Sequence, residues 1–336
     1  MSTGPTEGGF YRLHGALGSP YTMKMRALMR YRRLPHAFVQ DAPARTALLG
    51  RVKAPVIPVL EYPDGQVAND STFLTRDLEA RHAGREVIPP DPATAFLAFL
   101  IEDFADEWMT KAMFAYRWLR PVDQAQMARW LLFDAFPGAG AAAQEEAARL
   151  FRERQVGRMP LVGCTPANDA LITASTRRLL AILEAHVSDG IFLFGSRPSE
   201  AEFALFGQLS QLATDPTPST MMRADFPLAF RWLVHIDDLS GIDGDWGPPG
   251  PMVAPLLDLV GEVYLPFLRA NAAALEAGAP ELRFSAMGHD FAQPPFRYQQ
   301  KCLSALRAAH AALPADARAT VDPLLEASAC LAPLAG

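Results

Sequence analysis

Apolar and polar residues follow two different patterns along this chain. Between residues 10 and 83, short apolar runs typical of strands alternate with stripes of helical spacing, in the order β-α-β and then β-β-α. The segment 84–92 contains prolines that cannot continue a helix, and it is predicted to be a linker. From residue 93 to 278 the apolar positions recur at helical spacing, without a strand pattern of comparable strength. We therefore expect an α/β domain followed by a larger all-α domain.

Local signals place the elements of the α/β domain. Its first helix is predicted from a stripe formed by Met23, Ala27, Leu28 and Tyr31. Ser19 is a preferred N-cap and Pro20 suits the first helical position, so the helix should begin there. The runs VIPVLEY and QVA flank the turn sequence PDG and predict a hairpin. The segment NDSTFLTRDLEARH is then predicted to close the domain as a helix.

The remaining chain reads as one helix after another. Predicted helices span 93–119, 122–136, 141–155 and 169–187, begin near 199, 227 and 251, and end with 295–313. Ser199 and Glu202 form the S-x-x-E capping box that opens one of them. We expect residues 279–336 to form an extension packed on the helical domain, and residues 1–9 to be a disordered leader.

The composition of the chain argues against several classes of protein. The 336-residue chain has a net charge of -6, which argues against nucleic acid as a partner. No apolar run approaches the ~18 residues that a membrane span needs. The three cysteines are Cys164, Cys302 and Cys330, and no two form a C-x-x-C pair. They suit a reducing compartment, so we expect a cytoplasmic protein without a cysteine-built metal site or any other metal.

Two short sequences suggest a binding site in the α/β domain. Pro58 lies inside an apolar strand, where it removes a ladder hydrogen bond, so it marks either an edge strand or a special turn. Asp70 and Ser71 precede a predicted helix. They can cap its N-terminus, and they can also recognise a ligand that carries a carboxylate and an ammonium group. Both alternatives remain open from these residues alone.

Taken together, five sequences produce a family resemblance by their order and spacing. They are S-P-Y-T-M-K-M-R, V-I-P-V-L, the D-S pair, the proline-rich linker and G-S-R-P-S-E-A-E-F-A-L. From about Phe10 to Leu212 the chain resembles the glutathione S-transferase superfamily. The resemblance implies a thioredoxin-like glutathione-binding domain at 10–83, an all-helical domain, a homodimer, and glutathione as co-substrate. Residues from about 280 onward exceed the usual family length.

The resemblance also implies roles for individual residues. Pro58 would be a cis-proline, and Ile57 before it would pair with the cysteinyl backbone of glutathione. Asp70 and Ser71 would hold the γ-glutamyl end, although the family more often has Glu where Asp70 stands. Lys53, in the loop before Pro58, would meet the glycyl carboxylate.

Ser19 occupies the place of the leading cysteine of glutaredoxin-like members. A hydroxyl cannot perform thiol–disulfide exchange, so this activity is excluded at Ser19. The serine-type transferases offer another precedent, in which the hydroxyl stabilises the glutathione thiolate. The alternative is that Ser19 only caps the helix. Tyr11, His14 and Tyr21 are rival candidates for the catalytic group.

In this architecture the electrophile pocket is lined by the first long helix of the second domain. We expect Trp108, Met109 and Met113 to line it, together with Tyr21 from the first turn of the first helix. The leading hypothesis is an enzyme that conjugates glutathione to an electrophilic small molecule. The alternative is a non-catalytic module of the same fold that serves protein binding or assembly.

Overall fold

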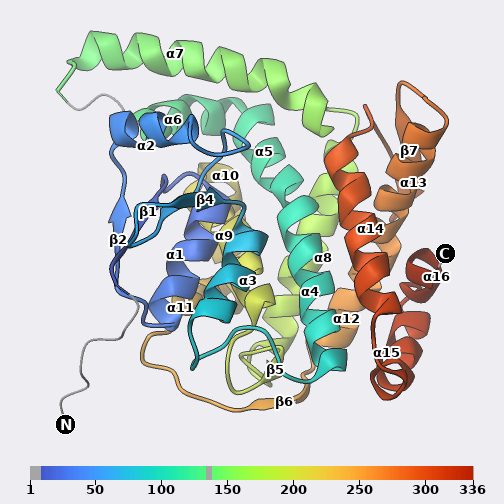
Figure 1. The fold of residues 1–336 in the computed structure, drawn as a ribbon. Coiled ribbons are helices and arrows are strands. Elements are labelled where there is room, and N and C mark those ends of the chain that lie inside the picture. The colour runs from blue at the N-terminus through green and yellow to red at the C-terminus, as the bar shows by residue number, and fades with distance from the viewer. Residues whose placement is uncertain (1–8, 134–137, 336) are drawn as a thin grey trace.

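The computed structural model describes residues 9–133 and 138–335 (Figure 1). The expected leader therefore lies outside the described residues except for Gly9. The α/β region contains β1 (Tyr11–His14), α1 (Pro20–Tyr31), β2 (His36–Val39), α2 (Ala42–Leu49), β3 (Val59–Glu61), β4 (Val67–Asn69) and α3 (Ser71–Arg81). This order confirms the predicted thioredoxin-like domain, apart from α2, which was not predicted. Leu48 is the one buried residue of α2, so its sequence lacks the apolar stripe that identified α1 and α3.

The four strands form one sheet in the order β2-β1-β3-β4. Strands β1 and β2 are parallel, whereas β3 is antiparallel to both β1 and β4. In this register His14 pairs with Val59, and Val59 pairs with Asn69. The end of β1, the start of β3 and the end of β4 consequently lie at one end of the sheet. Three segments leave or enter the sheet there: the loop before α1, the segment Ile57–Pro58, and the start of α3.

The helical region confirms the predicted all-α character. It contains α4 (Pro92–Glu107), α5 (Met109–Leu119), α6 (Pro121–Leu132), α7 (Ala141–Arg158), η2 (Met159–Val162), α8 (Asp169–His186), α9 (Glu200–Thr214), α10 (Pro216–Asp225), α11 (Pro227–Ile236), α12 (Val253–Leu259), η3 (Val260–Tyr264) and α13 (Leu265–Glu276). Short strands β5 (Phe194–Gly195) and β6 (Trp246–Pro249) pair beside α9. The capping box of Ser199 and Glu202 is formed as predicted. The single helix expected over 93–119 is instead divided at Trp108 into α4 and α5.

The last part of the chain contains β7 (Leu282–Ala286), β8 (His289–Gln293), α14 (Arg297–Ala311), α15 (Ala315–Ala327) and α16 (Leu331–Ala335). Strands β7 and β8 form a hairpin that was not predicted. Its two turn residues, Met287 and Gly288, both have positive φ, as the tight turns of two-residue hairpins require. Met at such a position is not a usual turn signal. The domain boundaries at 83, 92 and 278 stay predictions.

The last part packs against the helical core. Asn168 donates from Nδ2 to the Ala292 carbonyl at 2.7 Å, and Lys111 donates from Nζ to Gln293 Oε1 at 2.7 Å. Helix α14 also lies along α13 and α4 (Figure 1). None of the helices within the described ranges is long and apolar enough to cross a membrane.

The α/β and helical regions meet along α1 and α9. Gly207 of α9 faces the first turn of α1, and a Cβ atom added at this glycine would lie 2.5 Å from the Pro20 carbonyl oxygen. Only a residue without a side chain permits this approach of the two helices. The start of α1 is therefore held directly against the helical region.

Candidate active site

Ser19 lies at the sheet end where the three segments meet. It is the N-cap of α1, and its Oγ accepts a hydrogen bond from the Thr22 amide at 3.2 Å. The side chain is buried, with 8% of the residue exposed. A hydroxyl has two lone pairs and one proton, so accepting this bond leaves the proton available for donation. Capping by Ser19 is thus compatible with a second role.

The loop before Ser19 is fixed by the helical region. Gln211 of α9 donates from Nε2 to the Leu17 carbonyl at 3.0 Å, and Arg117 of α5 donates to the Gly18 carbonyl at 3.2 Å. Arg117 is itself buried in an ion pair with Asp215 at 2.9 Å. These bonds set the position of the Ser19 hydroxyl relative to α5 and α9.

The segment before β3 presents unpaired backbone groups. The Ile57–Pro58 peptide bond is cis. Within the described part of the chain, neither the N–H nor the C=O of Ile57 has a hydrogen-bond partner. Asn69 holds the preceding loop by donating from Nδ2 to the carbonyls of Ala54 and Val56, at 2.6 and 3.1 Å. Lys53 lies exposed at the start of this loop.

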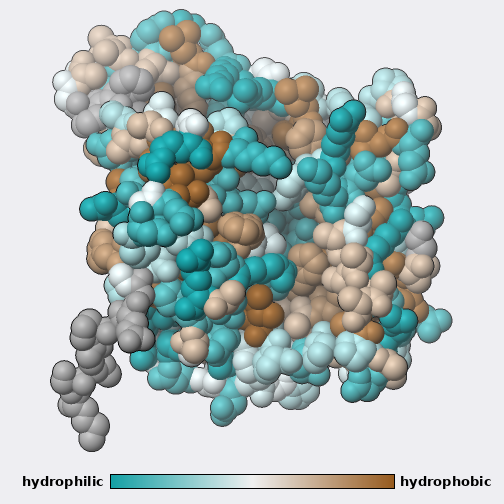
Figure 2. Space-filling model, viewed as in Figure 1, coloured by the Kyte–Doolittle hydropathy of each residue, from teal (hydrophilic) through white to brown (hydrophobic). Residues whose placement is uncertain are grey.

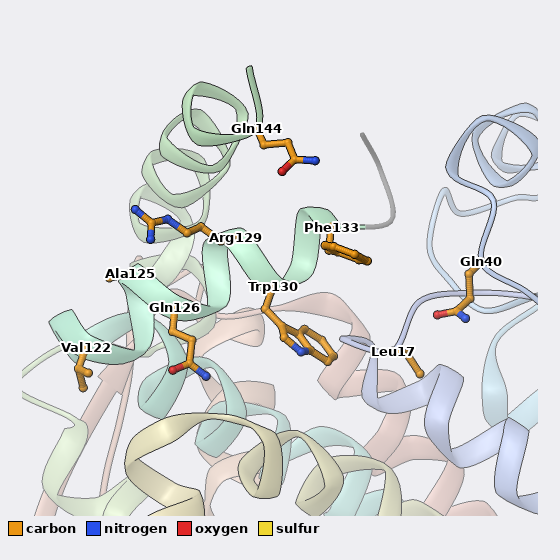
Figure 3. Close-up of a pocket in the computed structure, with 9 residues that line it drawn as sticks. All are labelled: Leu17, Gln40, Val122, Ala125, Gln126, Arg129, Trp130, Phe133 and Gln144. Carbon is orange, nitrogen blue, oxygen red and sulfur yellow. The ribbon is translucent and has the colours of Figure 1, made fainter. Parts of the chain in front are cut away.

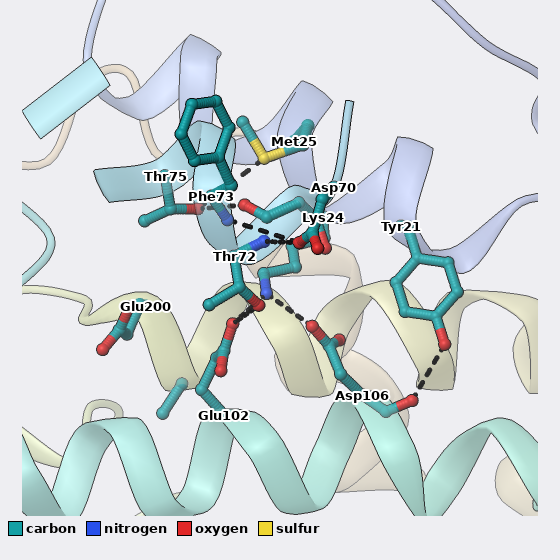
Figure 4. Close-up of polar contacts among 12 residues, drawn as sticks. Tyr21, Lys24, Met25, Asp70, Thr72, Phe73, Thr75, Glu102, Asp106 and Glu200 are labelled. Carbon is teal, nitrogen blue, oxygen red and sulfur yellow. Dashed lines mark hydrogen bonds and ion pairs between the residues drawn. The ribbon is translucent and has the colours of Figure 1, made fainter. Parts of the chain in front are cut away.

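Asp70 and Ser71 open α3 beside that loop. Asp70 has a φ of 79°, a strained value for a residue other than glycine. Its Oδ1 accepts from the amides of Thr72 and Phe73 at 3.2 and 3.3 Å (Figure 4). The amide and the hydroxyl of Ser71 make no hydrogen bond to any residue that the structure describes. The start of α3 therefore combines a carboxylate with two free donors.

Two rivals of Ser19, Tyr11 and His14, have hydrogen-bond partners of their own. The Tyr11 hydroxyl is 2.7 Å from Nε2 of His82, near the opposite end of β1. His14 is buried, and its Nε2 is 3.0 Å from Oε2 of Glu61. Each side chain therefore has a partner away from the start of α1, whereas Nδ1 of His14 is buried without a hydrogen-bond partner among the described residues.

The three residues predicted for the helical wall of the pocket are buried. Trp108, Met109 and Met113 are 1%, 1% and 5% exposed, because their side chains belong to the hydrophobic core. Trp108 donates from Nε1 to Ser175 Oγ at 3.0 Å and packs on Phe267 and Phe291. It faces the C-terminal hairpin and does not line a pocket.

A neighbouring stripe is partly exposed instead. Glu107, Thr110 and Phe114 recur at helical spacing along the break between α4 and α5. Tyr21 reaches this stripe from α1, since its hydroxyl donates to the Asp106 carbonyl at 3.0 Å (Figure 4). The surface is hollowed between the α/β region and α14 (Figure 2). The prediction of the pocket wall selected apolar residues, which are buried, and missed the more polar face of the same helices.

A buried charge cluster joins the two regions below this wall. Lys24 of α1 contacts Glu102 Oε1 at 2.5 Å and Asp106 Oδ2 at 2.6 Å. Burial lowers the pKa of Lys24, but the two carboxylates outweigh that effect and raise it. Burial raises the pKa of Asp106 to about 6, although Lys24 opposes the shift. Thr72 of α3 donates to Glu102 at 2.7 Å, so the cluster also fixes the start of α3 (Figure 4).

A separate pocket of about 890 Å³ lies beside the loop that carries Ser19 (Figure 3). It is lined by Leu17, Gln40, Val122, Ala125, Gln126, Arg129, Trp130, Phe133 and Gln144. The Cα atom of Leu17 is within about 7.6 Å of that of Ser19, since two peptide units separate them. None of these residues was predicted, because the pocket forms where α6 meets loops distant in sequence.

Two family models match the chain. The N-terminal domain of glutathione S-transferases matches residues 13–86, and the C-terminal domain matches residues 141–234. Together they cover half of the chain. No curated protein matches the sequence.

Several solved structures share parts of the fold. A glutathione S-transferase of Methylobacterium radiotolerans, in complex with glutathione sulfonate, is 20% identical, with a TM-score of 0.40, over 68% of this chain and 90% of its own. One from Rhodospirillum rubrum is 18% identical, with a TM-score of 0.41, over 74% of this chain and 91% of its own. Glutathione transferase GSTFuA3 of Phanerochaete chrysosporium is 15% identical, with a TM-score of 0.48, over 71% of this chain and 100% of its own. On the two domain matches and the observed fold, the chain belongs to the glutathione S-transferase superfamily.

Proposed function

We propose that this protein binds glutathione at the sheet end near Ser19 and transfers its thiolate to an electrophilic small molecule. One observation carries the proposal: the unpaired backbone of Ile57 and the free donors of Ser71 lie at the same end of the sheet. A short peptide with charged ends complements such a site, because an extended backbone pairs with free strand groups.

Each part of glutathione has a counterpart. The N–H and C=O of Ile57 would pair with the cysteinyl residue. The Ser71 amide and hydroxyl would bind the γ-glutamyl carboxylate, which the positive end of the α3 dipole also favours. The free oxygen of Asp70 would accept from the ammonium group, and Lys53 would meet the glycyl carboxylate.

Ser19 would stabilise the thiolate. A free thiol with a pKa of about 8.5 is only a few per cent ionised at neutral pH. A hydrogen bond to a charged group contributes about 1.5–3 kcal/mol, and a helix N-terminus adds about 0.3–1 kcal/mol. At about 1.36 kcal/mol for each pKa unit, these contributions lower the thiol pKa by roughly one and a half to three units. Thiolate then becomes a major species at neutral pH.

Calorimetric titration with glutathione tests the binding. We expect Ser71→Ala and Asp70→Asn to weaken binding about 10- to 100-fold. Ser71→Ala removes a hydrogen bond to the carboxylate of the ligand, and Asp70→Asn removes the negative charge that would face its ammonium group. Ser304→Ala removes an exposed serine on α14 and is the matched control, with unchanged affinity. No heat of binding at millimolar glutathione would contradict the proposal and favour the non-catalytic module.

The proposal also includes a homodimer and a cytoplasmic location, both of which the family resemblance implies. Sedimentation equilibrium tests the first, with twice the mass of one chain as the expected result. Cell fractionation tests the second.

A further inference from the structure

The pocket beside the loop that carries Ser19 has the size of a small-molecule site, and the proposed conjugation assigns no ligand to it. Its volume of about 890 Å³ lies within the range of about 300–1,000 Å³ that is usual for ligand sites. One face of α6 forms a wall of the pocket and contributes, at helical spacing, Val122, Gln126, Trp130 and Phe133. Met127 and Ala128 are buried on the other side of α6, so this wall is fixed to the helical region.

The indole ring of Trp130 is half-buried and held in place. It packs against the loop before α1, because a Cβ atom added at Gly18 would lie 3.6 Å from its Cζ3. That loop is itself fixed, since Arg117 and Gln211 donate to its carbonyls. Figure 3 shows the ring in the space between α6 and the loop that carries Leu17. An aromatic face that is already positioned can stack on a planar ligand at little cost in side-chain freedom.

Gln40 reaches the pocket from the α/β region, directly after β2 (Figure 3). Its Oε1 is buried and has no hydrogen-bond partner among the described residues. A carboxamide can form two parallel hydrogen bonds with a ring that carries an N–H beside an acceptor, as glutamine does with the edge of adenine. Because a buried acceptor without a partner is costly, a ligand N–H that reaches Oε1 gains affinity.

The charge in the lining is already balanced. Of the lining residues that the structure describes, Arg129 alone is charged, and its Nε donates to Glu145 Oε2 at 2.7 Å. The apolar part of the lining is open to a ligand, since Val122 and Phe133 are 59% and 70% exposed. These features favour an uncharged aromatic ligand over an aromatic anion.

We propose that this pocket binds an uncharged, planar aromatic molecule with a ring N–H next to a carbonyl, which is the chemistry of an aromatic lactam. The ring stacks on Trp130. The lactam N–H donates to Gln40 Oε1, and the lactam carbonyl accepts from Gln40 Nε2. This inference goes beyond the proposed function and does not rest on it, because neither Trp130 nor Gln40 is assigned to glutathione.

Calorimetric titration with 2-quinolone and N-methyl-2-quinolone tests the pairing with Gln40. The two probes share a ring system and a carbonyl, and the methyl group replaces the N–H. We expect the wild type to bind 2-quinolone at least about 5-fold more tightly. Gln40→Met removes the amide at a similar side-chain length and should abolish that difference. Gln155→Met, on α7 and outside the lining, is the matched control and should keep it.

Two further titrations test the ring and its charge. Trp130→Leu should weaken the binding of both quinolones about 10-fold or more, because both stack on the indole. 2-Naphthoate, a planar anion, should bind the wild type more weakly than 2-quinolone.

Four results would overturn the inference. They are no heat of binding with millimolar 2-quinolone, equal affinities of the wild type for the two quinolones, a difference that persists in Gln40→Met, and tighter binding of 2-naphthoate. The titrations contain no glutathione, so each of these results leaves the proposed function intact. A failure to bind glutathione would likewise leave this inference intact.

Discussion

Lys24 of α1 and Glu102 of α4 form an ion pair across the α/β and helical regions, with Nζ and Oε1 2.5 Å apart and both side chains almost inaccessible. Asp106 and Thr72 complete the cluster, so α1, α3 and α4 are fixed to one another. Because α1 and α3 also begin at the candidate glutathione site, this buried pair links the stability of the domain contact to the geometry of the site.

Replacing Lys24 should strongly destabilise the protein. Lys24→Met leaves Glu102 and Asp106 buried without their cation, and the expected loss in the free energy of unfolding is about 3–5 kcal/mol. Urea denaturation measures it. The double variant Lys24→Met/Glu102→Gln removes one stranded charge and should recover part of the loss. A double variant that is less stable than Lys24→Met would show that this charge is not the cause.

The free energy of unfolding should decrease as the pH rises from about 4 to about 7, because of the raised pKa of Asp103. Burial raises the pKa of Asp103 from 3.8 to about 7, although a hydrogen bond from Tyr264 opposes the shift. Between these values the unfolded chain loses a proton that the folded chain keeps. The contribution is therefore fully present below about pH 4 and lost by about pH 7. Asp103→Asn removes it, so its unfolding free energy should fall less steeply with pH across this window. Parallel pH dependences of the variant and the wild type would contradict the assignment.

Two substitutions separate the two roles of Ser19. Ser19→Ala removes the hydroxyl and the cap, whereas Ser19→Gly removes the hydroxyl and costs the helix only a few tenths of a kcal/mol. If the hydroxyl stabilises the thiolate, both variants should raise the pKa of bound glutathione by about one to two units, measured by ultraviolet absorbance of the thiolate. If Ser19→Gly alone left the pKa of bound glutathione near its wild-type value, Ser19 would serve only as an N-cap.

Asn69 should position the peptide-binding edge without contacting the sulfur. Asn69→Ala frees the carbonyls of Ala54 and Val56, and the loop that carries Ile57 loses two hydrogen bonds. We expect KM for glutathione to rise about 3- to 10-fold, in line with a net loss of about 1 kcal/mol, while kcat changes little. A fall in kcat with an unchanged KM would argue against this role.

Trp108 should matter for stability and not for catalysis. Trp108→Phe leaves Ser175 without its indole donor and opens a cavity beside Phe267 and Phe291, so thermal unfolding should occur several degrees lower. The kcat/KM of the folded variant should match the wild type. A change in electrophile selectivity would indicate that Trp108 does line the substrate pocket.

The sequence was sufficient for the α/β half of the candidate site because its signals are local. Ser19 before Pro20 and Asp70 before α3 are capping positions, which short-range rules identify. Ile57 depended on the family resemblance instead, because Pro58 by itself indicates only an edge strand or a special turn. The register of β1, β3 and β4 then brings these positions together, and the family resemblance supplied that arrangement in advance.

The helical wall required information that hydrophobicity does not contain. Trp108, Met109 and Met113 are the apolar choices on the first long helix, but apolar residues are also those that fill a core. All three side chains are buried, and Trp108 packs on the C-terminal hairpin. Glu107, one residue earlier, is partly exposed. The pocket at Leu17 and Trp130 depends on contacts across more than a hundred residues, which no local pattern encodes.

Gly207 limits which α/β domains of other family members could be joined to this helical region. The helical region accepts the start of α1 with no room for even a methyl group at the contact. An α/β domain borrowed from another member would have to match that spacing before its own thiol-binding groups could be presented correctly. Chimaeras joined at the linker should therefore need a glycine in α9 opposite the first turn of α1. Exchange of the two domains without that match should yield insoluble or inactive hybrids.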